Sequence, residues 1–265
     1  MLCKGRNIRL LIAYDGTDYL GWQRQGGNGV SAEEQSASPF TGTIQGLIED
    51  ALGKLHKTPV PLTGSGRTDS GVHAAGQIAN FYTSIDSMEA ERFVPALNSL
   101  LPGDIRILEA RETRPDFHAR FDARQRTYRY FFITDREPMP WESRYAWPLR
   151  RQPDLAKLNE YARLFRGEMD CSSFCVPGDK SLSRHRYISG ASFYMEGGKL
   201  VFEISANAFL WKMVRSVAGT LIRSEKKGLS MDDLRKIIGS GDCNLAGPTA
   251  PAQGLFLWKI DYYRD

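Results

Sequence analysis

The segment 64–76 has the residue types best suited to chemistry, because four glycines there surround one arginine, one aspartate and one histidine. Glycine permits positive φ angles and lets a ligand approach the backbone closely. Asp69 is the only carboxylate of the segment. Arg67, two residues earlier, could lower the pKa of Asp69 and keep it ionised as a nucleophile or a general base. The segment is therefore a candidate active-site loop.

A purely structural role is the alternative for this segment. An aspartate in a glycine-rich turn often accepts hydrogen bonds from its own backbone while a neighbouring arginine lies in solvent. The flanking residues Pro59–Thr63 and Gln77–Thr83 are predicted to form short β-strands. Two such strands would hold the loop on a rigid scaffold, where catalytic residues are usually found. The residue types alone allow either role.

The cysteines and histidines form no recognisable metal site. Four irregularly spaced cysteines indicate a reducing compartment rather than a disulfide framework. Cys171 and Cys175 could bind a metal, but no second Cys or His pair stands at zinc-site spacing, so buried free thiols are favoured. His73 could be a general base, although shaping the loop through hydrogen bonds is the favoured role. His118 is interpreted similarly, and neither histidine is assigned to catalysis.

The charge of the chain is mildly basic, with a net charge of +4 and a pI near 8.8, which is weak evidence for nucleic-acid binding. The distribution is more informative, because arginines alternate with aromatic residues over 111–130. Arginine suits phosphate contacts and aromatic rings stack on unpaired bases, so this segment could contact folded RNA. A solvated strand face explains the pattern equally well. The residues are Arg111, Arg114, Arg120, Arg124, Arg126 and Arg129, with Phe117, Phe121, Tyr128 and Tyr130.

The composition is that of an ordinary globular protein. With 265 residues and 29.8 kDa the chain has room for one large or two small domains. Its 42% hydrophobic and 25% charged residues are typical of soluble proteins. No apolar run approaches the ~18 residues that span a membrane, and the first residues lack a signal-peptide core. We therefore expect a cytoplasmic protein without a membrane segment.

The apolar pattern predicts the same order of elements in each half of the chain: strand, helix, strand, strand, helix, strand. In the first half the expected strands are 7–14, 59–63, 77–83 and 104–110, and the expected helices are 43–55 and 88–101. In the second half the expected strands are 126–133, 184–195, 199–206 and 254–262, and the expected helices are 153–166, 208–226 and a short one from Ser230. Residues 26–42, with little apolar content, are expected to be a mobile loop.

This order implies two ferredoxin-like β-α-β-β-α-β halves and an α+β fold. We expect a mixed, mostly antiparallel sheet with helices on one face and a central basic cleft. The predicted halves are residues 1–115, which carry the Asp69 loop, and residues 116–265. A cleft between halves is a common place for a binding site.

The order of residues in the candidate loop is more specific than their types. Arg67-Thr68-Asp69-Ser70-Gly71-Val72-His73-Ala74 closely resembles the R-T-D-x-G-V-H-A signature of TruA-type tRNA pseudouridine synthases. The resemblance extends over nearly the whole chain. Its other motifs are Tyr14-Asp15-Gly16-Thr17, Gly21-Trp22-Gln23-Arg24-Gln25, Thr43-Ile44-Gln45-Gly46, Phe117-His118-Ala119-Arg120, Arg126-Thr127-Tyr128-Arg129-Tyr130, Phe209-Leu210 with Met213-Val214-Arg215, and Pro251-Ala252-Gln253-Gly254-Leu255.

The resemblance implies an isomerase that converts uridine to pseudouridine at positions 38, 39 and 40 of the tRNA anticodon stem-loop. It implies two related α+β halves in a homodimer whose basic clefts take tRNA, with no metal and no cofactor. By the same resemblance, Asp69 is the catalytic aspartate, Tyr128 is the active-site tyrosine, and Arg215 is the arginine that pairs with the aspartate. The C-terminal half therefore carries the active-site tyrosine and arginine.

Four residues are predicted to bind the substrate. Arg67 matches the signature arginine, which is implicated in RNA contact, and Tyr128 could stack on the base. Arg24 belongs to a matching N-terminal motif. Lys212 is expected on one side of the helix that carries Arg215, where a solvated basic face is a competing explanation.

The sequence departs from the family pattern at three places. Residues 26–42 lengthen a usually shorter loop, Ser70 replaces the commoner Ala, and Asn207-Ala208-Phe209 replaces the usual N-G-F. None of these changes removes a predicted catalytic group. The long loop leaves open which uridines are modified.

Three other functions compete with this interpretation. A non-catalytic RNA-binding module could use the same arginines and aromatic residues to hold RNA. A glycoside hydrolase usually needs paired carboxylates, whereas only Asp69 stands out. A metal-dependent nuclease is disfavoured because the four histidines are scattered, with no ligand spacing.

Overall fold

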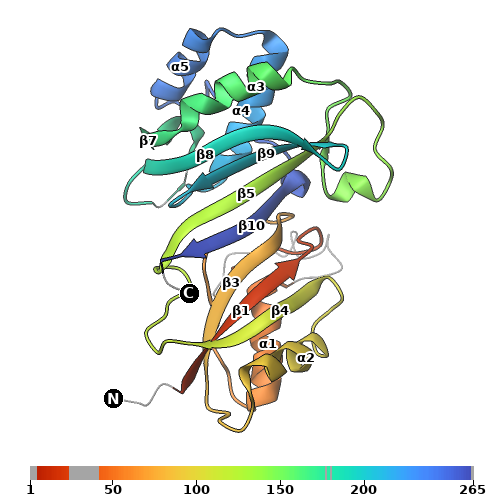
Figure 1. Ribbon diagram of the computed structural model, residues 1–265, viewed down its shortest axis with the longest axis vertical. Helices are drawn as coiled ribbons and strands as arrows, with labels where there is room; N and C mark the ends of the chain where they lie inside the picture. The colour runs from red at the N-terminus through yellow and green to blue at the C-terminus, as the bar shows by residue number, and fades with distance from the viewer. Residues whose placement is uncertain (1–4, 24–41, 177, 180, 264–265) are drawn as a thin grey trace. The chain divides into compact units, whose positions relative to one another are not determined.

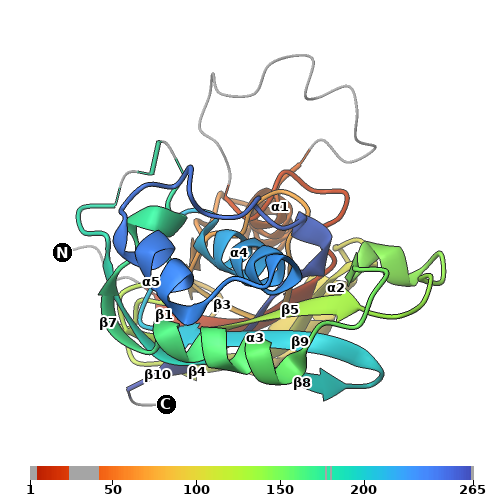
Figure 2. The same cartoon turned by 90° about the horizontal axis from the view of Figure 1, so that it is seen from above.

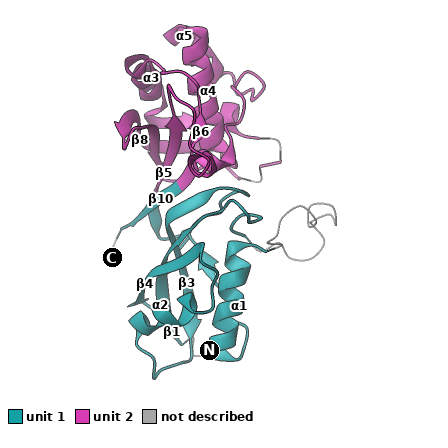
Figure 3. Ribbon diagram, turned by 90° about the vertical axis from the view of Figure 1, so that its right-hand side faces the viewer, with its two compact units in different colours: residues 1–124, 257–265 teal, residues 125–256 magenta. Residues whose placement is uncertain are grey.

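The computed structural model describes residues 5–23, 42–176, 178–179 and 181–263 (Figure 1; Figure 2). Ten β-strands, assigned to a mixed sheet, and five α-helices lie within these residues, so the predicted α+β class is confirmed. The chain divides into two compact units, formed by residues 1–124 with 257–265 and by residues 125–256 (Figure 3). The ferredoxin-like character of the halves, their limits at 115 and 116, and the basic cleft stay predictions.

The sheet of the first unit is built around strand β1 (Arg6–Tyr14). It pairs antiparallel with β3 (His73–Thr83) on one side and with β4 (Ile105–Thr113) on the other. The short strand β2 (Thr63–Gly64) also pairs with β3. Most of β10 (Leu255–Tyr262) belongs to this unit as well. The strand that carries the end of the candidate loop is therefore central in the unit.

Two helices pack on one face of these strands. Helix α1 (Ile44–His56) begins after Thr43, whose side chain accepts the backbone N–H of Gly46 as an N-cap. Helix α2 (Phe93–Asn98) contacts α1. The ring of Phe81 on β3 meets the ring of Phe93 edge-on at 5.3 Å, which fixes α2 against the sheet. The predicted helix over 43–55 is confirmed.

Two predictions for the first unit are wrong in extent. The expected strand Pro59–Thr63 shrinks to Thr63–Gly64, because prolines at positions 59 and 61 cannot donate to a strand ladder. The N–H of Leu62 bonds the Glu49 side chain instead of a neighbouring strand. The expected helix over 88–101 is limited to a 3₁₀ turn, Ala90–Arg92, and the six residues of α2.

The second unit has its strands in the order β5-β9-β8-β7, and every pair in this order is antiparallel. Gly197 and Gly198 join β8 to β9 with φ angles of +57° and +74°, as a two-residue hairpin turn requires. A short strand pairs parallel with β5. The strands are β5 (Ala123–Ile133), β6 (Trp147–Pro148), β7 (Gly167–Asp170), β8 (His185–Glu196) and β9 (Lys199–Ala206). The sequence pattern did not predict β6 and β7.

Three helices accompany these strands: α3 (Leu155–Ala162), α4 (Met213–Lys227) and α5 (Met231–Gly239). Helix α3 contacts α4 and α5 and packs against β8. The short helix expected from Ser230 is confirmed, and Ser230 and Asp233 form a capping box at its start. No helix among the described residues is both long enough and apolar enough to cross a membrane.

Helices α3 and α4 are shorter than the sequence predicts. Helix α3 ends at Ala162 and continues as a 3₁₀ turn, and α4 begins at Met213 instead of Ala208. The side chain of Asn207 accepts the backbone N–H groups of Tyr187 and Ala208, which holds this segment as a loop. Lys212 then has a φ of +58°, a left-handed conformation that a continuous helix cannot contain.

Candidate active site

The half-buried Asp69 lies between β2 and β3 on a loop that rests on an earlier part of the chain. The carbonyl oxygen of Thr68 accepts the N–H of Trp22 at 3.1 Å, and the carbonyl oxygen of Asp69 accepts the N–H of Val72 at 3.1 Å. Gly21 packs directly against the loop, since a Cβ there would lie 2.5 Å from the Thr68 carbonyl oxygen. The backbone of Asp69 is therefore fixed from both sides.

The side chains next to Asp69 add two more anchors. The hydroxyl groups of Tyr14 and Thr68 are 2.8 Å apart, and both side chains are buried. The hydroxyl of Ser70 donates to the backbone carbonyl of Tyr19 at 2.9 Å. Because Ser70 is one of the departures from the family pattern, its hydroxyl gives this loop a contact that alanine could not make.

The first part of the loop is fixed by buried polar contacts. The hydroxyl of Ser65 bonds the side-chain oxygen of Gln77 at 2.5 Å, and the Gln77 amide donates to the carbonyl of Gly66 at 3.0 Å. Arg67, in contrast, is exposed, and its Nε donates to the Gln23 side chain at 3.1 Å. An exposed, weakly held arginine at this position is free to reach for a phosphate.

His73 is fully buried at the start of β3. Its Nδ1 lies 3.1 Å from the backbone nitrogen of Gly16 and 3.1 Å from the Asp15 carboxylate. These contacts join the turn after β1 to the end of the candidate loop. The prediction that His73 shapes the loop through hydrogen bonds is therefore confirmed.

Tyr128 lies on β5 of the second unit, opposite Ile204 of β9. It is 9% exposed, and its ring meets the ring of Phe209 edge-on at 5.1 Å. Phe209 belongs to the loop before α4, so that loop contacts the predicted active-site tyrosine. This packing holds the ring in one orientation while part of its surface stays accessible.

Arg215 is the third residue of α4 and is half-buried. Its Nε donates to the carbonyl of Ala250 at 2.7 Å, and its own carbonyl accepts the N–H of Ala250 at 3.1 Å. Two bonds to one residue fix the helix end and the guanidinium together. The pairing of Arg215 with Asp69 stays a prediction, because it joins residues of different units.

The predicted substrate-binding residues Lys212 and Arg24 do not lie on a described helix. Lys212 does not lie on the side of the helix as expected, because it precedes α4, where its Nζ lies 4.9 Å from the ring centre of Trp211. Arg24 lies outside the described residues, as do nearly all residues of the predicted long loop. Arg223, further along α4, is exposed and donates to the carbonyl of Ala246.

Acidic partners neutralise part of the arginine-rich segment. Arg129 lies 2.7 Å from the carboxylate of Glu203 and 3.2 Å from that of Glu196. Arg114 pairs with the carboxylate of Asp122. Burial acts to raise the pKa of this carboxyl, but hydrogen bonds from the His118 backbone and the Arg114 side chain together lower it. Within the alternating segment, Arg114 and Arg129 therefore form ion pairs.

Two other arginines of that segment pair with exposed aromatic rings in the first unit. Arg120 lies 5.7 Å from the ring centre of Phe121, which is 74% exposed. Arg124 lies 5.3 Å from the ring centre of Tyr263, which is 76% exposed. Exposed arginine and aromatic pairs of this kind suit contacts with phosphates and unpaired bases.

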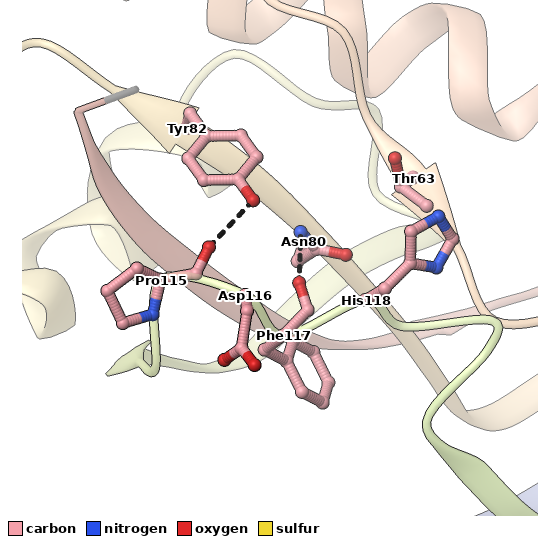
Figure 4. Close-up of a pocket in the computed structure, with 7 residues that line it drawn as sticks. All are labelled: Thr63, Asn80, Tyr82, Pro115, Asp116, Phe117 and His118. Atoms are coloured by element: carbon pink, nitrogen blue, oxygen red, sulfur yellow. Dashed lines mark hydrogen bonds between the residues drawn. The ribbon is translucent and has the colours of Figure 1, made fainter. Parts of the chain in front are cut away.

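A depression of about 640 Å³ in the first unit is separate from the Asp69 loop (Figure 4). Its buried residue Asn80 accepts the N–H of Ala119 and donates to the side chain of Asn7, and the hydroxyl of Tyr82 donates to the carbonyl of Pro115. These bonds fasten the segment after β4 to the sheet. No residue that we predict to act in catalysis lines this depression.

The thiols lie away from these contacts. Cys171 and Cys175 are free and buried, as the sequence predicts, and burial raises the pKa of the Cys171 thiol to about 11. A thiol with so high a pKa is a poor nucleophile at neutral pH. Within the described ranges, no three residues among His, Cys, Asp and Glu are grouped as a metal site would require.

An α+β protein that presents one anchored carboxylate from a glycine-rich loop, and that carries exposed arginine and aromatic pairs, has the features of an RNA-modifying enzyme. A family model described as tRNA pseudouridine synthase matches residues 10–122 and 161–263, and the chain belongs to this family. It is therefore an isomerase that converts uridine to pseudouridine in tRNA, as the sequence predicted. The matched ranges include Asp69 and Arg215 and leave out Tyr128.

Individual relatives agree with this assignment. The chain is 51% identical over 260 residues to tRNA pseudouridine synthase A of Treponema denticola, covering 98% of this chain and 94% of the relative. It is 40% identical over 257 residues to tRNA pseudouridine synthase A of Caldicellulosiruptor saccharolyticus, covering 97% and 100%. The crystal structure of a Cbf5-Nop10-Gar1 complex matches 81% of this chain and 44% of that chain with a TM-score of 0.33 and 12% identity, which is too low to bear on the fold.

The sequence did not reveal the groups that anchor Asp69, namely Tyr14, Gly21 and Tyr19. A signal for two of them existed, because Tyr14 and Gly21 stand in motifs shared with the family. The residue types of Tyr14 and Gly21 did not by themselves suggest a contact with the Asp69 loop. Their contacts show that they support the loop that carries Asp69.

Proposed function

We propose that this enzyme modifies uridines 38, 39 and 40 of the tRNA anticodon stem-loop and that Asp69 is its catalytic nucleophile or base. The observation that carries the proposal is the anchored Asp69 within an eight-residue match to the family signature. Five contacts, from Tyr14, Tyr19, Gly21, Trp22 and Val72, fix the residues on either side of its carboxylate. Such fixed placement is what a group reacting at a defined atom needs.

The reaction is an isomerisation in which atoms and electrons balance without a co-reactant. The bond between N1 of uracil and C1′ of the ribose breaks, the base turns, and C5 then bonds C1′. The proton of C5 leaves, and N1 gains a proton. A carboxylate near the ribose can either attack C1′ or remove the proton of C2′, and we assign this step to Asp69.

Tyr128 and Arg215 have supporting roles in this proposal. The ring of Tyr128 stacks on the turned base and assists removal of the C5 proton. Arg215 keeps the carboxylate of Asp69 ionised and oriented through a charge-assisted pair. Because Asp69 belongs to one compact unit and the other two residues to the second, their common site rests on the family resemblance.

The RNA itself is held by basic and aromatic groups. We assign phosphate contacts to Arg67, Lys212 and Arg24, and the target uridine must leave its stack before it can react. The proposal includes a cytoplasmic homodimer whose basic clefts take tRNA, and these parts also rest on the resemblance. Arg67 supports it best, since its guanidinium is exposed two residues from the reacting carboxylate.

Release of tritium from C5 of uridine in an unmodified tRNA transcript tests the proposal. The wild-type enzyme is compared with Asp69→Asn, and Asp86→Asn is the matched control because Asp86 is an exposed carboxylate of the same unit. We expect release by the wild type and the control and none by Asp69→Asn. Release by Asp69→Asn at the wild-type rate would refute the assigned role of Asp69.

Transcripts in which uridine stands at only one of positions 38, 39 and 40 test the site of modification. Release from each of the three, and none from a transcript with cytidine at all three, supports the proposal. Release that persists without uridine at these positions would show a different target. Tight binding without any release would instead indicate a binding protein.

A further inference from the structure

The segment from Ala246 to Pro251 lies along helix α4 and is held there at its first residues. Nη1 of Arg223 donates to the carbonyl of Ala246 at 3.1 Å. The N–H of Gly247 donates to the hydroxyl of Thr220 at 2.8 Å. The segment therefore uses both a charged and a neutral side chain of α4, one turn apart.

Gly219 lets the segment approach the helix axis. A Cβ at position 219 would lie 1.8 Å from the carbonyl oxygen of Pro248 and 3.2 Å from the nitrogen of Ala250. Both contacts are with backbone, so a side chain at this position would have to push the segment away. The missing Cβ thus sets the distance between α4 and this segment.

The last residues of the segment bond the predicted catalytic residue Arg215 and a tyrosine of the strand that carries Tyr128. Ala250 makes its two hydrogen bonds to Arg215, and the carbonyl of Pro251 accepts the hydroxyl of Tyr130 at 2.7 Å. Tyr130 stands two residues after Tyr128 on β5 and so shares its face of the strand. Burial raises the pKa of Tyr130, and the charge of Arg215 opposes that rise.

We propose that the Ala246–Pro251 segment is a positioning element that holds the guanidinium of Arg215 in its reactive orientation, with Gly219 setting its place. The bond from Nε to the carbonyl of Ala250 fixes one edge of the planar guanidinium. The same segment ties Arg215 to the strand that carries Tyr128. This inference rests on the proposed role of Arg215 in catalysis.

The proposal is tested by comparing Gly219→Ala with Gly239→Ala in the tritium-release assay on unmodified tRNA. Gly239 is the matched control, because it also lies in a helix of this unit and a Cβ there would meet nothing within 4 Å. We expect Gly219→Ala to lower kcat about 100-fold, the effect of displacing a reacting group by about 1 Å. KM for tRNA should change less than about twofold in both variants, and kcat of the control should stay within about twofold of wild type.

A double-variant experiment separates positioning from general damage to the fold. Arg215→Lys keeps the positive charge. It lacks the planar guanidinium that could donate to the carbonyl of Ala250 and to the carboxylate of Asp69 at the same time. If the segment acts through Arg215, adding Gly219→Ala to Arg215→Lys lowers kcat by much less than 100-fold. A further fall as large as in the wild-type background would overturn the proposal. Thr220→Val removes the bond from the N–H of Gly247 together with the bond that the Thr220 hydroxyl donates to the carbonyl of Ser216 within α4. It gives a milder variant with the same expected pattern if Gly219→Ala does not fold.

A wrong assignment of Arg215 in the proposed function would give a different set of kcat values from a wrong positioning proposal. If Arg215→Lys itself leaves kcat unchanged, the catalytic role of Arg215 is wrong and the positioning proposal falls with it. If Arg215→Lys lowers kcat but Gly219→Ala does not, only the positioning proposal is overturned.

Discussion

Replacing Gly21 by alanine should displace the loop that carries Asp69. Gly21 has a φ of +85°, a left-handed conformation that costs an L-residue about 1–2 kcal/mol. The new Cβ would lie 2.5 Å from the carbonyl oxygen of Thr68 and 3.0 Å from the carbonyl carbon of Asp69. Because these are backbone atoms, the loop itself must move to relieve the contact.

The size of the effect follows from these contacts. The bond from the N–H of Trp22 to the Thr68 carbonyl is weakened when that carbonyl moves, at a cost of about 1 kcal/mol. With the backbone strain, the free energy of unfolding should fall by about 2–3 kcal/mol. For a chain of this length the melting temperature should fall by about 5–10 °C. A displacement of Asp69 by about 1 Å should lower kcat about 100-fold.

The assay compares Gly21→Ala with Gly66→Ala by urea unfolding and by tritium release from tRNA. Gly66 is the control because it lies in the loop that carries Asp69. Its φ is not left-handed, and a Cβ there would meet nothing within 4 Å. Gly66→Ala should stay within about 0.5 kcal/mol of the wild-type stability. If both variants match the wild type in stability and turnover, the contact of Gly21 with the loop does not position Asp69.

Three further changes give distinct expectations. Tyr14→Phe removes the buried bond to the Thr68 hydroxyl, so urea unfolding should show a loss of about 1 kcal/mol, and an unchanged midpoint would contradict this. Hydrogen bonds from Arg136 and the backbone lower the pKa of Glu142 from 4.5 to about 2, so its stabilising effect is present above pH 4.5 and is lost as the pH falls towards 2; Glu142→Gln should flatten the acid dependence of thermal unfolding in that range. Arg129→Ala should leave the salt dependence of tRNA binding unchanged, because its guanidinium pairs with carboxylates, whereas a phosphate contact would lower the slope by about 1.

The sequence located the loop of Asp69 because its signature residues are consecutive. A contiguous motif can be recognised without knowledge of tertiary contacts, and its glycines alone indicated a turn. The bond between Tyr14 and Thr68 joins positions 54 residues apart, so no local pattern could reveal it. Local chemistry therefore predicted Asp69 as the candidate reacting group, and tertiary packing determines what holds its loop in place.

The errors in the predicted elements have local physical causes. In the segment from Pro59 to Thr63 the apolar alternation is real, since Val60 and Leu62 are buried, but the prolines exclude a ladder. The helix expected from Ala208 starts later because the Asn207 side chain offers the backbone a competing bond. The spacing of apolar residues predicts which residues are buried, but it does not predict where the backbone hydrogen bonds form.

The charge pattern was ambiguous in sequence for a related reason. Arg129 pairs with Glu203, which stands 74 residues later on β9, and Arg114 pairs with Asp122, eight residues along the chain. Neither ion pair can be read from the alternation of arginines with aromatic residues. Arg120 and Arg124 instead lie over exposed rings. The partner of each arginine therefore decides whether a carboxylate neutralises its charge.

The C-terminal motif Pro251-Ala252-Gln253-Gly254-Leu255 has no residue that performs chemistry, yet its contacts explain why it resembles the family pattern. The carbonyl of Pro251 accepts the hydroxyl of Tyr130, and a Cβ on Gly254 would lie 2.5 Å from the Tyr130 ring. Only glycine fits against that ring. Ala250, the residue before this motif, bonds Arg215. The motif therefore fixes β5, which carries Tyr130, and α4, which carries Arg215, relative to each other within the second unit. Its sequence is therefore constrained by the placement of two other residues.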